Sequence, residues 1–323
     1  MSDRFQILSL DGGGLKGIFT ASFLAAMEEI TGTRIVDKFD LIAGTSTGGI
    51  IAIALGLGFS PKEILNFYKE RGKEIFPAQT RWSRTMVSVK WVVQRKYPAE
   101  PLRQALHDYF GDRRLGHSTK RLIIPSYDSV RGDVHLYKTP HHKRLKTDYK
   151  ELAMDVALST TSAPTYLPAW TSETGVRLID GGIWANNPSM VALAEALGYL
   201  NQSQGSIAML SIGTTRQAIT SMRKHIAGGL WTWRSKALEF MMAGQSRAAE
   251  NQCLHILGRD KFLRINPIVG GRYALDKMSC ELEGIGRTEA RNAVNELGSM
   301  FLSHEALPYE AIYTLADEVD QEK

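Results

Sequence analysis

A serine in a glycine-flanked turn has the residue types and spacing of an acyl-transfer nucleophile. Gly44-Thr45-Ser46-Thr47-Gly48 fits the pattern G-x-S-x-G and lies between a predicted strand, Leu41-Ile42-Ala43, and an apolar predicted helix, Thr47 to Leu57. Small residues at both ends allow a sharp turn that projects the serine oxygen out of the sheet. The N-terminus of the following helix stabilises negative charge at that point. The turn therefore predicts Ser46 as a nucleophile, and the alternative is a serine that only caps a helix.

A second glycine-rich turn, Asp11 to Gly17 (DGGGLKG), follows the predicted strand Phe5 to Leu10. Consecutive backbone N–H groups at Gly12, Gly13 and Gly14 form a concave surface suited to an oxyanion or a phosphate. The segment lacks the Lys-Ser/Thr ending of a P-loop, so nucleotide hydrolysis fits poorly, and its match to G-x-G-x-x-G is a weak signal. Because the chain also carries a nucleophile turn, we favour an oxyanion hole.

A carboxylate for the same reaction is found at Asp180-Gly181-Gly182, directly after the predicted strand Val176 to Ile179. An aspartate at this position can accept the proton of Ser46 and act as a general base. The competing interpretation is an ordinary Asp-Gly turn. A Ser-acid-His triad is the other alternative. Its candidate histidines, none of which has local support, are His225, His255 and His304.

Strand-like and helix-like patterns alternate along the chain around these residues. The further predicted strands are Leu122 to Tyr127, Val134 to Tyr137, Ile207 to Ile212 and Phe262 to Ile265. The predicted helices are Ile18 to Ile30, Pro61 to Ile75, Pro101 to Phe110, Tyr149 to Leu158, Pro188 to Leu200, Ile226 to Ala249 and Ser279 to Leu297. This alternation over 323 residues predicts an α/β fold with a mainly parallel sheet covered on both faces.

Composition excludes several classes of protein. The 43% hydrophobic and 23% charged fractions are typical of a folded globular chain, and the net charge of +5 favours anionic partners. Cys253 and Cys280 lack a paired CxxC spacing, so we expect neither a disulfide framework nor a zinc ribbon. The expected compartment is a reducing cytoplasm. The amino terminus lacks the pattern of a secretory signal. The longest apolar segment, Gly48 to Phe59, is too short to span a bilayer, so any membrane contact is expected to be peripheral.

Two basic stretches, 81–99 and 216–247, contain tryptophans and have the composition of surfaces that contact phosphate groups of lipids or nucleotides. The alternative is a solvated helix face. The residues predicted as regulatory nucleotide or membrane contacts are Arg81, Trp82, Arg216, Arg223, Lys224 and Arg234.

The three motifs, in this order, resemble the patatin-like phospholipase family. The resemblance covers about Phe5 to Leu200 and includes D-G-G-G-x-[KR]-G, G-x-S-x-G and D-G-[GA]. Segments similar to the family also flank Asp180, at Ser162 to Pro168 and at Asn186-Asn187-Pro188. The resemblance implies a three-layer α/β/α fold, with 5–200 as the hydrolase core. We expect 201–323 to complete the same compact unit, because no linker long enough to mark a domain boundary is found in the sequence.

The resemblance also implies a Ser-Asp dyad, with Ser46 as nucleophile and Asp180 as base. Backbone amides of Gly12, Gly13, Gly14 and Thr47 are then the oxyanion hole. The supporting motif positions are Asp11, Lys16, Gly17, Gly44, Gly48, Gly181 and Gly182. Lys16 stands where many members have arginine, so the charge is kept and the planar fork is lost.

The implied activity is that of a phospholipase A-type acyl hydrolase, which cleaves fatty acyl esters of membrane glycerophospholipids without a metal or an organic cofactor. The alternatives are a small-ester or thioester hydrolase, and a nucleotide-binding module that leaves Ser46 and Asp180 without a task. The overall plan also resembles phospholipase effectors of cyclic-nucleotide anti-phage (CBASS) systems, which implies activation by a cyclic dinucleotide in antiviral defence. We expect a cytoplasmic protein, peripheral at the inner membrane when active, without a DNA partner. A homo-oligomer is an open alternative.

Overall fold

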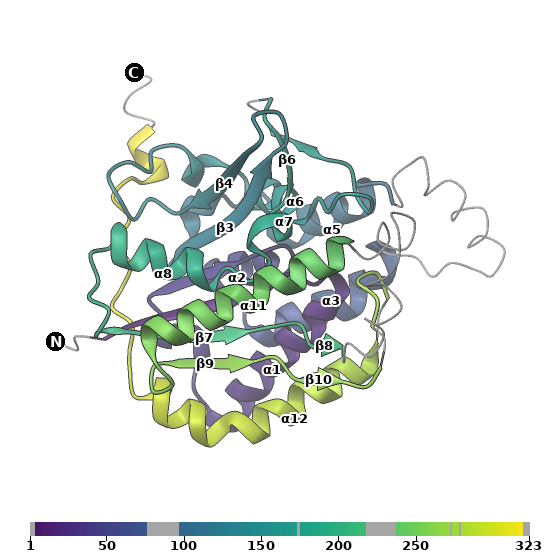
Figure 1. Cartoon of the computed structure of the whole chain (residues 1–323). Coiled ribbons are helices and arrows are strands. Elements are labelled where there is room, and N and C mark those ends of the chain that lie inside the picture. Colours follow the sequence, from purple (N-terminus) through teal and green to yellow (C-terminus); the bar gives the residue numbers. More distant parts are fainter. Residues whose placement is uncertain are drawn as a thin grey trace.

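The computed structural model describes residues 4–75, 97–172, 175–217, 237–271, 273–277 and 279–318 (Figure 1). Within these residues the centre of the molecule is an eight-stranded mixed sheet with the order β5-β6-β3-β2-β1-β7-β9, and β4 pairs with β3. The strands are β1 (Phe5–Leu10), β2 (Leu41–Gly44), β3 (Arg121–Asp128), β4 (Asp133–Lys138), β5 (Trp170–Thr171), β6 (Arg177–Asp180), β7 (Ile207–Ile212) and β9 (Phe262–Ile265). The five strands from β3 to β9 are parallel, whereas β4 and β6 pair antiparallel with β3 and β5 pairs antiparallel with β6.

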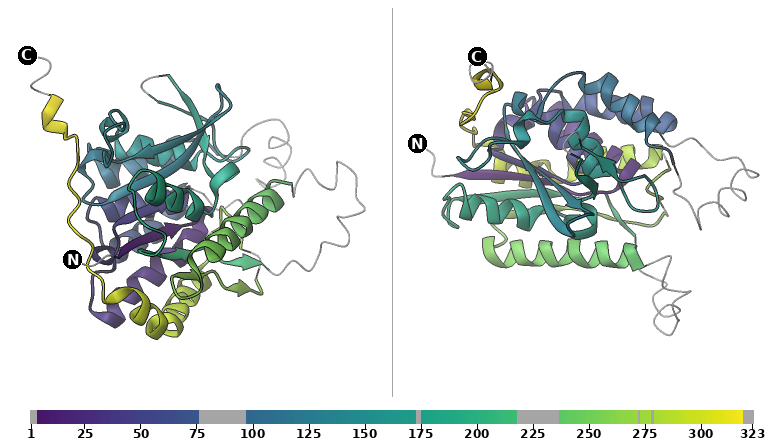
Figure 2. Two further views of the ribbon diagram at one scale, coloured as in Figure 1. Left: turned by 60° about the vertical axis from the view of Figure 1, so that its left-hand side comes forward. Right: turned by 90° about the horizontal axis from the view of Figure 1, so that it is seen from above.

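Helices cover both faces of this sheet, which confirms the predicted three-layer α/β/α arrangement (Figure 2). The helices of the first face are α1 (Gly17–Thr31), α2 (Thr47–Gly56), α3 (Pro61–Ile75), α5 (Glu100–Phe110), α6 (Ala153–Thr161) and α12 (Cys280–Leu297). The other face carries α8 (Ser189–Gly198) and α11 (Ala237–Leu257), with the short α7 (Gly182–Ala185) beside α11. No helix of the described residues is both long and apolar enough to cross a bilayer.

Successive side chains of the central strands point to opposite faces of the sheet, and each face has its own hydrophobic core. Leu8 and Ile42 point into the larger core with α1 and α2, whereas Ile7 and Leu41 point into a smaller core with α8 and α11. Because both faces of β1 and β2 are covered, these strands are continuous apolar runs. This burial holds the carboxyl ends of β1 and β2, where both glycine-rich turns begin, at one edge of the sheet.

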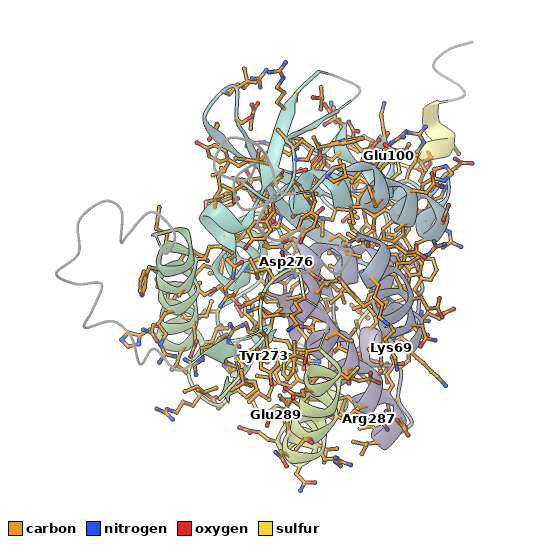
Figure 3. All side chains as sticks on the ribbon, turned by 90° about the vertical axis from the view of Figure 1, so that its right-hand side faces the viewer. Lys69, Glu100, Tyr273, Asp276, Arg287 and Glu289 are labelled. Carbon is orange, nitrogen blue, oxygen red and sulfur yellow. The ribbon has the colours of Figure 1, made fainter. Side chains whose placement is uncertain are left out.

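The carboxy-terminal helix α12 packs along α1 on the outside of the larger core. Gly286 permits the close approach, because a Cβ there would lie 2.6 Å from the Phe19 carbonyl oxygen. Figure 3 labels Lys69 of α3 and Arg287 of α12. Lys69 pairs with Glu283 of α12, and Arg287 pairs with Glu29 of α1. Exposed pairs of this kind add little stability, so apolar packing holds α12 in place.

Most predicted elements have the expected bounds; the exceptions have local causes. The helix predicted from Tyr149 begins at Ala153, because Asp148–Lys150 forms a separate 3₁₀ turn and Leu152 is extended. The helix predicted over 226–249 continues to Leu257, and its first residues lie outside the described part of the chain. The short elements β5, α7, β8 (Arg216–Gln217) and β10 (Ile268–Val269) were not predicted.

Candidate active site

The turn that carries Ser46 connects the end of β2 to the start of α2. Ser46 has φ 55° and ψ −122°, a backbone conformation that is strained for a side chain with a Cβ. A Cβ on Gly44 would lie 2.1 Å from the Gly48 carbonyl oxygen, and one on Gly48 would lie 2.3 Å from the Leu10 carbonyl oxygen. Both positions of the G-x-S-x-G pattern therefore require glycine, because the turn packs backbone against backbone.

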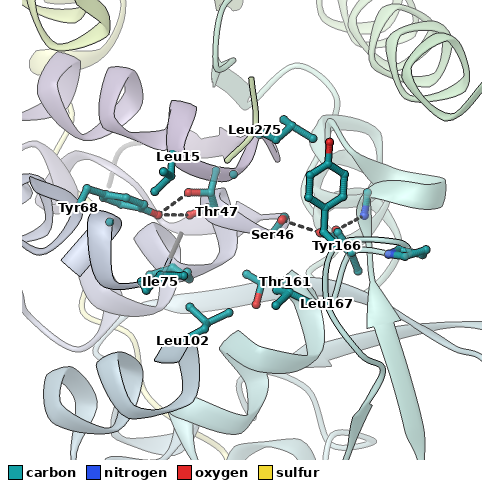
Figure 4. Close-up of a pocket in the computed structure, with 18 of the residues that line it drawn as sticks. Leu15, Ser46, Thr47, Tyr68, Ile75, Leu102, Thr161, Tyr166, Leu167 and Leu275 are labelled. Atoms are coloured by element: carbon teal, nitrogen blue, oxygen red, sulfur yellow. Dashed lines mark hydrogen bonds between the residues drawn. The ribbon is translucent and has the colours of Figure 1, made fainter. Parts of the chain in front are cut away.

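Ser46 and Asp180 are in direct contact across the sheet. The Ser46 hydroxyl donates a hydrogen bond of 2.7 Å to Asp180 Oδ2, and the Gly182 N–H donates one of 2.7 Å to Asp180 Oδ1 (Figure 4). Asp180 is the last residue of β6, which reaches Ser46 because β6 pairs with β3 and β3 pairs with β2. The side chains thus meet although they are 134 residues apart in the sequence.

Both residues of this pair are buried, and Ser46 is only 8% exposed. Burial raises the pKa of the Asp180 carboxyl to about 6, although the hydrogen bonds from Ser46 and Gly182 act in the opposite direction. A carboxylate with a pKa near neutrality is a stronger proton acceptor than an ordinary aspartate. The geometry and the pKa together suit Asp180 to removing a proton from the hydroxyl.

The predicted oxyanion donors are not equivalent. The Gly12 N–H donates to the Asn186 carbonyl oxygen at 2.9 Å, so the prediction that it serves an oxyanion needs correction. The N–H groups of Gly13, Gly14 and Thr47 have no acceptor among the described residues, and all three residues line the pocket beside Ser46. These three amides are the donors left for a negatively charged oxygen.

Glycine is required in this loop for steric reasons as well. Gly14 has φ 57°, and a Cβ on it would lie 2.3 Å from the Leu275 carbonyl oxygen. A Cβ on Gly13 would lie 2.2 Å from Thr214 Oγ1. Replacement of either glycine would move the loop itself, in addition to crowding a substrate oxygen.

Asp11 has a buried partner that the sequence analysis missed. Arg264 of β9 donates from Nη1 to Asp11 Oδ1 at 2.8 Å and from Nη2 to Asp11 Oδ2 at 2.5 Å, and Nη1 also donates to Ser211 Oγ at 2.8 Å. This two-pronged contact fixes the residue that opens the glycine loop. The available signal was one arginine inside the short apolar strand Phe262–Ile265. Lys16, at the end of the 3₁₀ turn Gly14–Lys16, is half-buried.

An apolar pocket with a cavity volume of about 90 Å³ opens beside the Ser46–Asp180 pair. Figure 4 shows the apolar side chains that surround Ser46 in this pocket. They include Leu15, Ile75, Leu102, Leu167 and Leu275, with Ile50, Phe67 and Met242. Tyr68 on the wall donates its hydroxyl to the Thr47 carbonyl oxygen at 3.1 Å. The pocket offers apolar surface for a hydrocarbon chain next to a nucleophile.

The other predicted residues lie apart from this pocket. His304 is bonded to Asp40 at 2.9 Å and His255 is exposed on α11; neither lines the pocket, so neither can complete a triad with Ser46. Arg216 is half-buried, donates from Nε to the Asn266 carbonyl oxygen and does not line the pocket. The predicted residues outside the described part of the chain are Arg81, Trp82, Arg223, Lys224, His225 and Arg234. Among the described residues no group of three His, Cys, Asp or Glu side chains has the spacing to hold a metal ion.

Comparison with known proteins places this geometry in a family. A model described as "Patatin-like phospholipase" matches residues 8–193, more than half of the chain. The chain belongs to the patatin-like phospholipase family. It is therefore a hydrolase, and its activity is that of a phospholipase. The matched part includes Ser46, Asp180 and the glycine loop, whereas Arg264 and Met242 lie beyond it.

Individual relatives match over most of the patatin-like chain. A "cGAMP-activated phospholipase" of Pseudomonas aeruginosa is 30% identical over 260 residues, which cover 80% of this chain and 77% of the relative. A "cGAMP-activated phospholipase" of Escherichia coli is 34% identical over 242 residues, covering 71% and 67% respectively. The crystal structure of VipD from Legionella pneumophila aligns with a TM-score of 0.48 at 12% identity, over 91% of this chain and 67% of its own.

Proposed function

We propose that this phospholipase cleaves acyl esters of glycerophospholipids with Ser46 as nucleophile and Asp180 as general base. The observation that carries the proposal is the 2.7 Å hydrogen bond from the Ser46 hydroxyl to Asp180 at the wall of an apolar pocket. Ser46 Oγ attacks the ester carbonyl carbon while its proton moves to Asp180 Oδ2. The amides of Gly13, Gly14 and Thr47 receive the negative charge that develops on the carbonyl oxygen.

The second half of the reaction reverses the direction of proton transfer. Asp180 gives its proton to the leaving alcohol, the C–O bond breaks, and the acyl group remains on Ser46. A water molecule then attacks the acyl ester while Asp180 accepts one of its protons, and the fatty acid leaves as Ser46 regains its hydrogen. The raised pKa of Asp180 favours this exchange, because the same carboxyl must both accept and release a proton.

The apolar lining supports a long acyl chain as the group that enters the pocket. A small-ester or thioester hydrolase would use the same dyad, so substrate chain length separates it from a phospholipase A. A nucleotide-binding module at the glycine loop is poorly supported, because Leu15, Leu275 and Thr47 surround Gly13 and Gly14 with few polar partners for a base or a ribose.

We propose further that a cyclic dinucleotide activates the enzyme in antiviral defence. The two relatives at 30% and 34% identity are each named for activation by cGAMP. A ligand can activate the enzyme only by binding an active conformation more tightly than an inactive one. The basic and aromatic residues predicted as contacts for an activator or a membrane, including Arg216, stay predictions. The same holds for the peripheral location at the inner membrane, for the cytoplasmic location and for oligomer formation.

We also propose that residues 201–323 complete one unit with the hydrolase core, 5–200. Support comes from β7, which pairs along the whole length of β1, and from Arg264 of β9, which binds Asp11. Neither segment has a complete core without the other.

Phospholipid vesicles and a soluble chromogenic ester, each with and without cGAMP, test the proposal. Ser46→Ala and Asp180→Asn are expected to lower turnover on both substrates by about 10³-fold or more. The matched control is Ser203→Ala, which removes a hydroxyl from an exposed turn. Turnover above a tenth of the wild-type rate in Ser46→Ala would reject the nucleophile. Vesicle hydrolysis that does not respond to cGAMP would reject the activation and leave the dyad in place.

A further inference from the structure

The two halves of α11 are attached to the molecule differently. The carboxy-terminal half buries Ala249, Cys253 and Leu257, two of which belong to the smaller core. The described side chains of the other half, 240–248, include none that is buried, and Met241 is 66% exposed. Figure 1 shows this half of α11 extending beside α7, away from α8. Met242 lines the pocket, but no fully buried apolar side chain among those described anchors this half.

Polar contacts with the turn that follows α7 hold this half of α11. The Asn187 N–H donates to Gln245 Oε1 at 3.1 Å, and Gln245 Nε2 donates to the Asn187 carbonyl oxygen at 3.3 Å. Asn187 Nδ2 donates to the Ser246 carbonyl oxygen and Asn186 Nδ2 donates to Ser246 Oγ, both at 3.2 Å. Four hydrogen bonds thus connect Gln245 and Ser246 of α11 to the two adjacent asparagines.

Asn186 connects these hydrogen bonds to the glycine loop that contains two of the oxyanion amides. Its carbonyl oxygen accepts the Gly12 N–H at 2.9 Å. Its Oδ1 is buried and has no hydrogen-bond partner among the described residues, and it would lie 2.6 Å from a Cβ on Gly12 and 3.2 Å from a Cβ on Gly182. Asn186 therefore fits between Gly12, which precedes the free amides of the loop, and Gly182, whose N–H binds Asp180.

A second contact joins α11 to the same loop. Glu250 of α11 lies 3.7 Å from Arg264 Nε, and the other two nitrogens of the guanidinium bind Asp11, the residue before Gly12. Side chains of α11 are thus connected to Asp11 through Arg264 and to Gly12 through Asn186.

We propose that Gln245 and Ser246 are positioning residues, which hold the Asn186-Asn187 turn against the glycine loop and thereby aim the oxyanion amides at the substrate carbonyl. This inference rests on the proposed hydrolysis at Ser46. Gln245 and Ser246 do not line the pocket, and Met242 is its one described lining residue from α11. Loss of these side-chain hydrogen bonds is therefore expected to lower kcat and to leave KM nearly unchanged, because the surface that holds the acyl chain stays in place.

The experiment compares Gln245→Ala and Ser246→Ala with Gln252→Ala on the soluble ester. Gln252 is an exposed glutamine of the same helix whose side chain makes no hydrogen bond to the described residues, so it controls for the loss of a polar group from α11. We expect kcat to fall by about 10- to 100-fold in the first two variants, as for a misaligned catalytic group, with KM within about twofold of wild type. Ser246→Thr keeps the hydroxyl, which can still accept from Asn186 Nδ2, and should keep kcat within about threefold of wild type.

Two further readouts separate positioning from a general loss of folded protein. End-point titration of the active serine with a fluorophosphonate counts competent molecules, and kcat is divided by that count. The affinity for a trifluoromethyl ketone, which forms a tetrahedral oxyanion on serine, should fall in proportion to kcat. The inference is overturned if the corrected kcat of Gln245→Ala and Ser246→Ala equals that of Gln252→Ala. If Ser46→Ala retains activity, the proposed function fails and the inference fails with it. If Ser46→Ala is inactive while Gln245→Ala and Ser246→Ala keep the activity of Gln252→Ala, only the inference fails.

Discussion

Replacement of Asp180 by asparagine should inactivate the enzyme and stabilise its fold. At neutral pH the buried carboxylate is charged, and burial raises its pKa from the ordinary 3.8 to about 6. This difference corresponds to about 3 kcal/mol, at about 1.36 kcal/mol per pKa unit. An asparagine is neutral, has the same shape, and can still accept the Gly182 N–H and bond to Ser46. At pH 8 the free energy of unfolding of Asp180→Asn should therefore exceed that of wild type by up to about 3 kcal/mol.

The pH dependence of this gain has a defined sign. Between about pH 4 and 6 the folded wild-type protein binds more protons at Asp180 than the unfolded chain does, so wild-type stability falls as pH rises through that window. Below the window the carboxyl is protonated in both states, and the variant and wild type should be equally stable. Other titrating groups are common to both proteins and cancel in the difference.

Thermal and urea unfolding from pH 4 to pH 8 measure this difference. At about 2.1 cal/mol/K per residue for 323 residues, 3 kcal/mol corresponds to a melting temperature about 4 °C higher for the variant at pH 8. Asp112→Asn, which neutralises an exposed carboxylate, is the control and should show no such change. A variant that is less stable than wild type at pH 8, or a difference that does not vary with pH, would refute the account of Asp180 as a buried, destabilised base.

Three further results are expected. The kcat/KM of the wild-type enzyme on a soluble ester should rise with pH around an apparent pKa of about 6, because Asp180 accepts a proton only when it is ionised; a flat profile from pH 5 to 7 would contradict this. Gly48→Ala should fail to give folded protein, since its Cβ would lie 2.3 Å from a carbonyl oxygen, whereas Gly198→Ala, in open space on α8, should have a melting temperature close to wild type. Arg264→Met should lower the free energy of unfolding by about 3–5 kcal/mol by leaving Asp11 buried and unpaired, and urea unfolding at wild-type stability would disprove that role.

Local sequence patterns predicted the elements that depend on local burial. The strands β1, β7 and β9 have their predicted bounds, because each is a short apolar run bounded by polar or glycine residues. The helix α3 also has its predicted bounds, with a proline at its first position and an apolar face buried against the larger core. Ser46 and Asp180 were predicted from motifs whose glycines allow sharp turns, and the sheet brings the two side chains to 2.7 Å.

The remaining features depend on contacts between distant parts of the chain. Whether the Gly12 N–H is free depends on the Asn186 carbonyl, and the partner of Asp11 is 253 residues away at Arg264. No periodicity or spacing near Asp11 contains that information. The four-residue α7 is too short to produce a helical period, so its place between Asp180 and Asn186 could not be predicted.

Because Arg264 follows Asp11 by 253 positions, we expect a newly made chain to become competent only late in its synthesis. A ribosome adds about 5–20 residues per second, so the 253 residues between the two are made in about 13 to 50 s. During that time Ser46 and Asp180 are both translated, yet the loop still lacks the guanidinium that binds both carboxylate oxygens of Asp11. The nascent chain is therefore expected to stay inert toward lipid until β9 has left the ribosome, which protects the producing cell's own bilayer from an unfinished lipase.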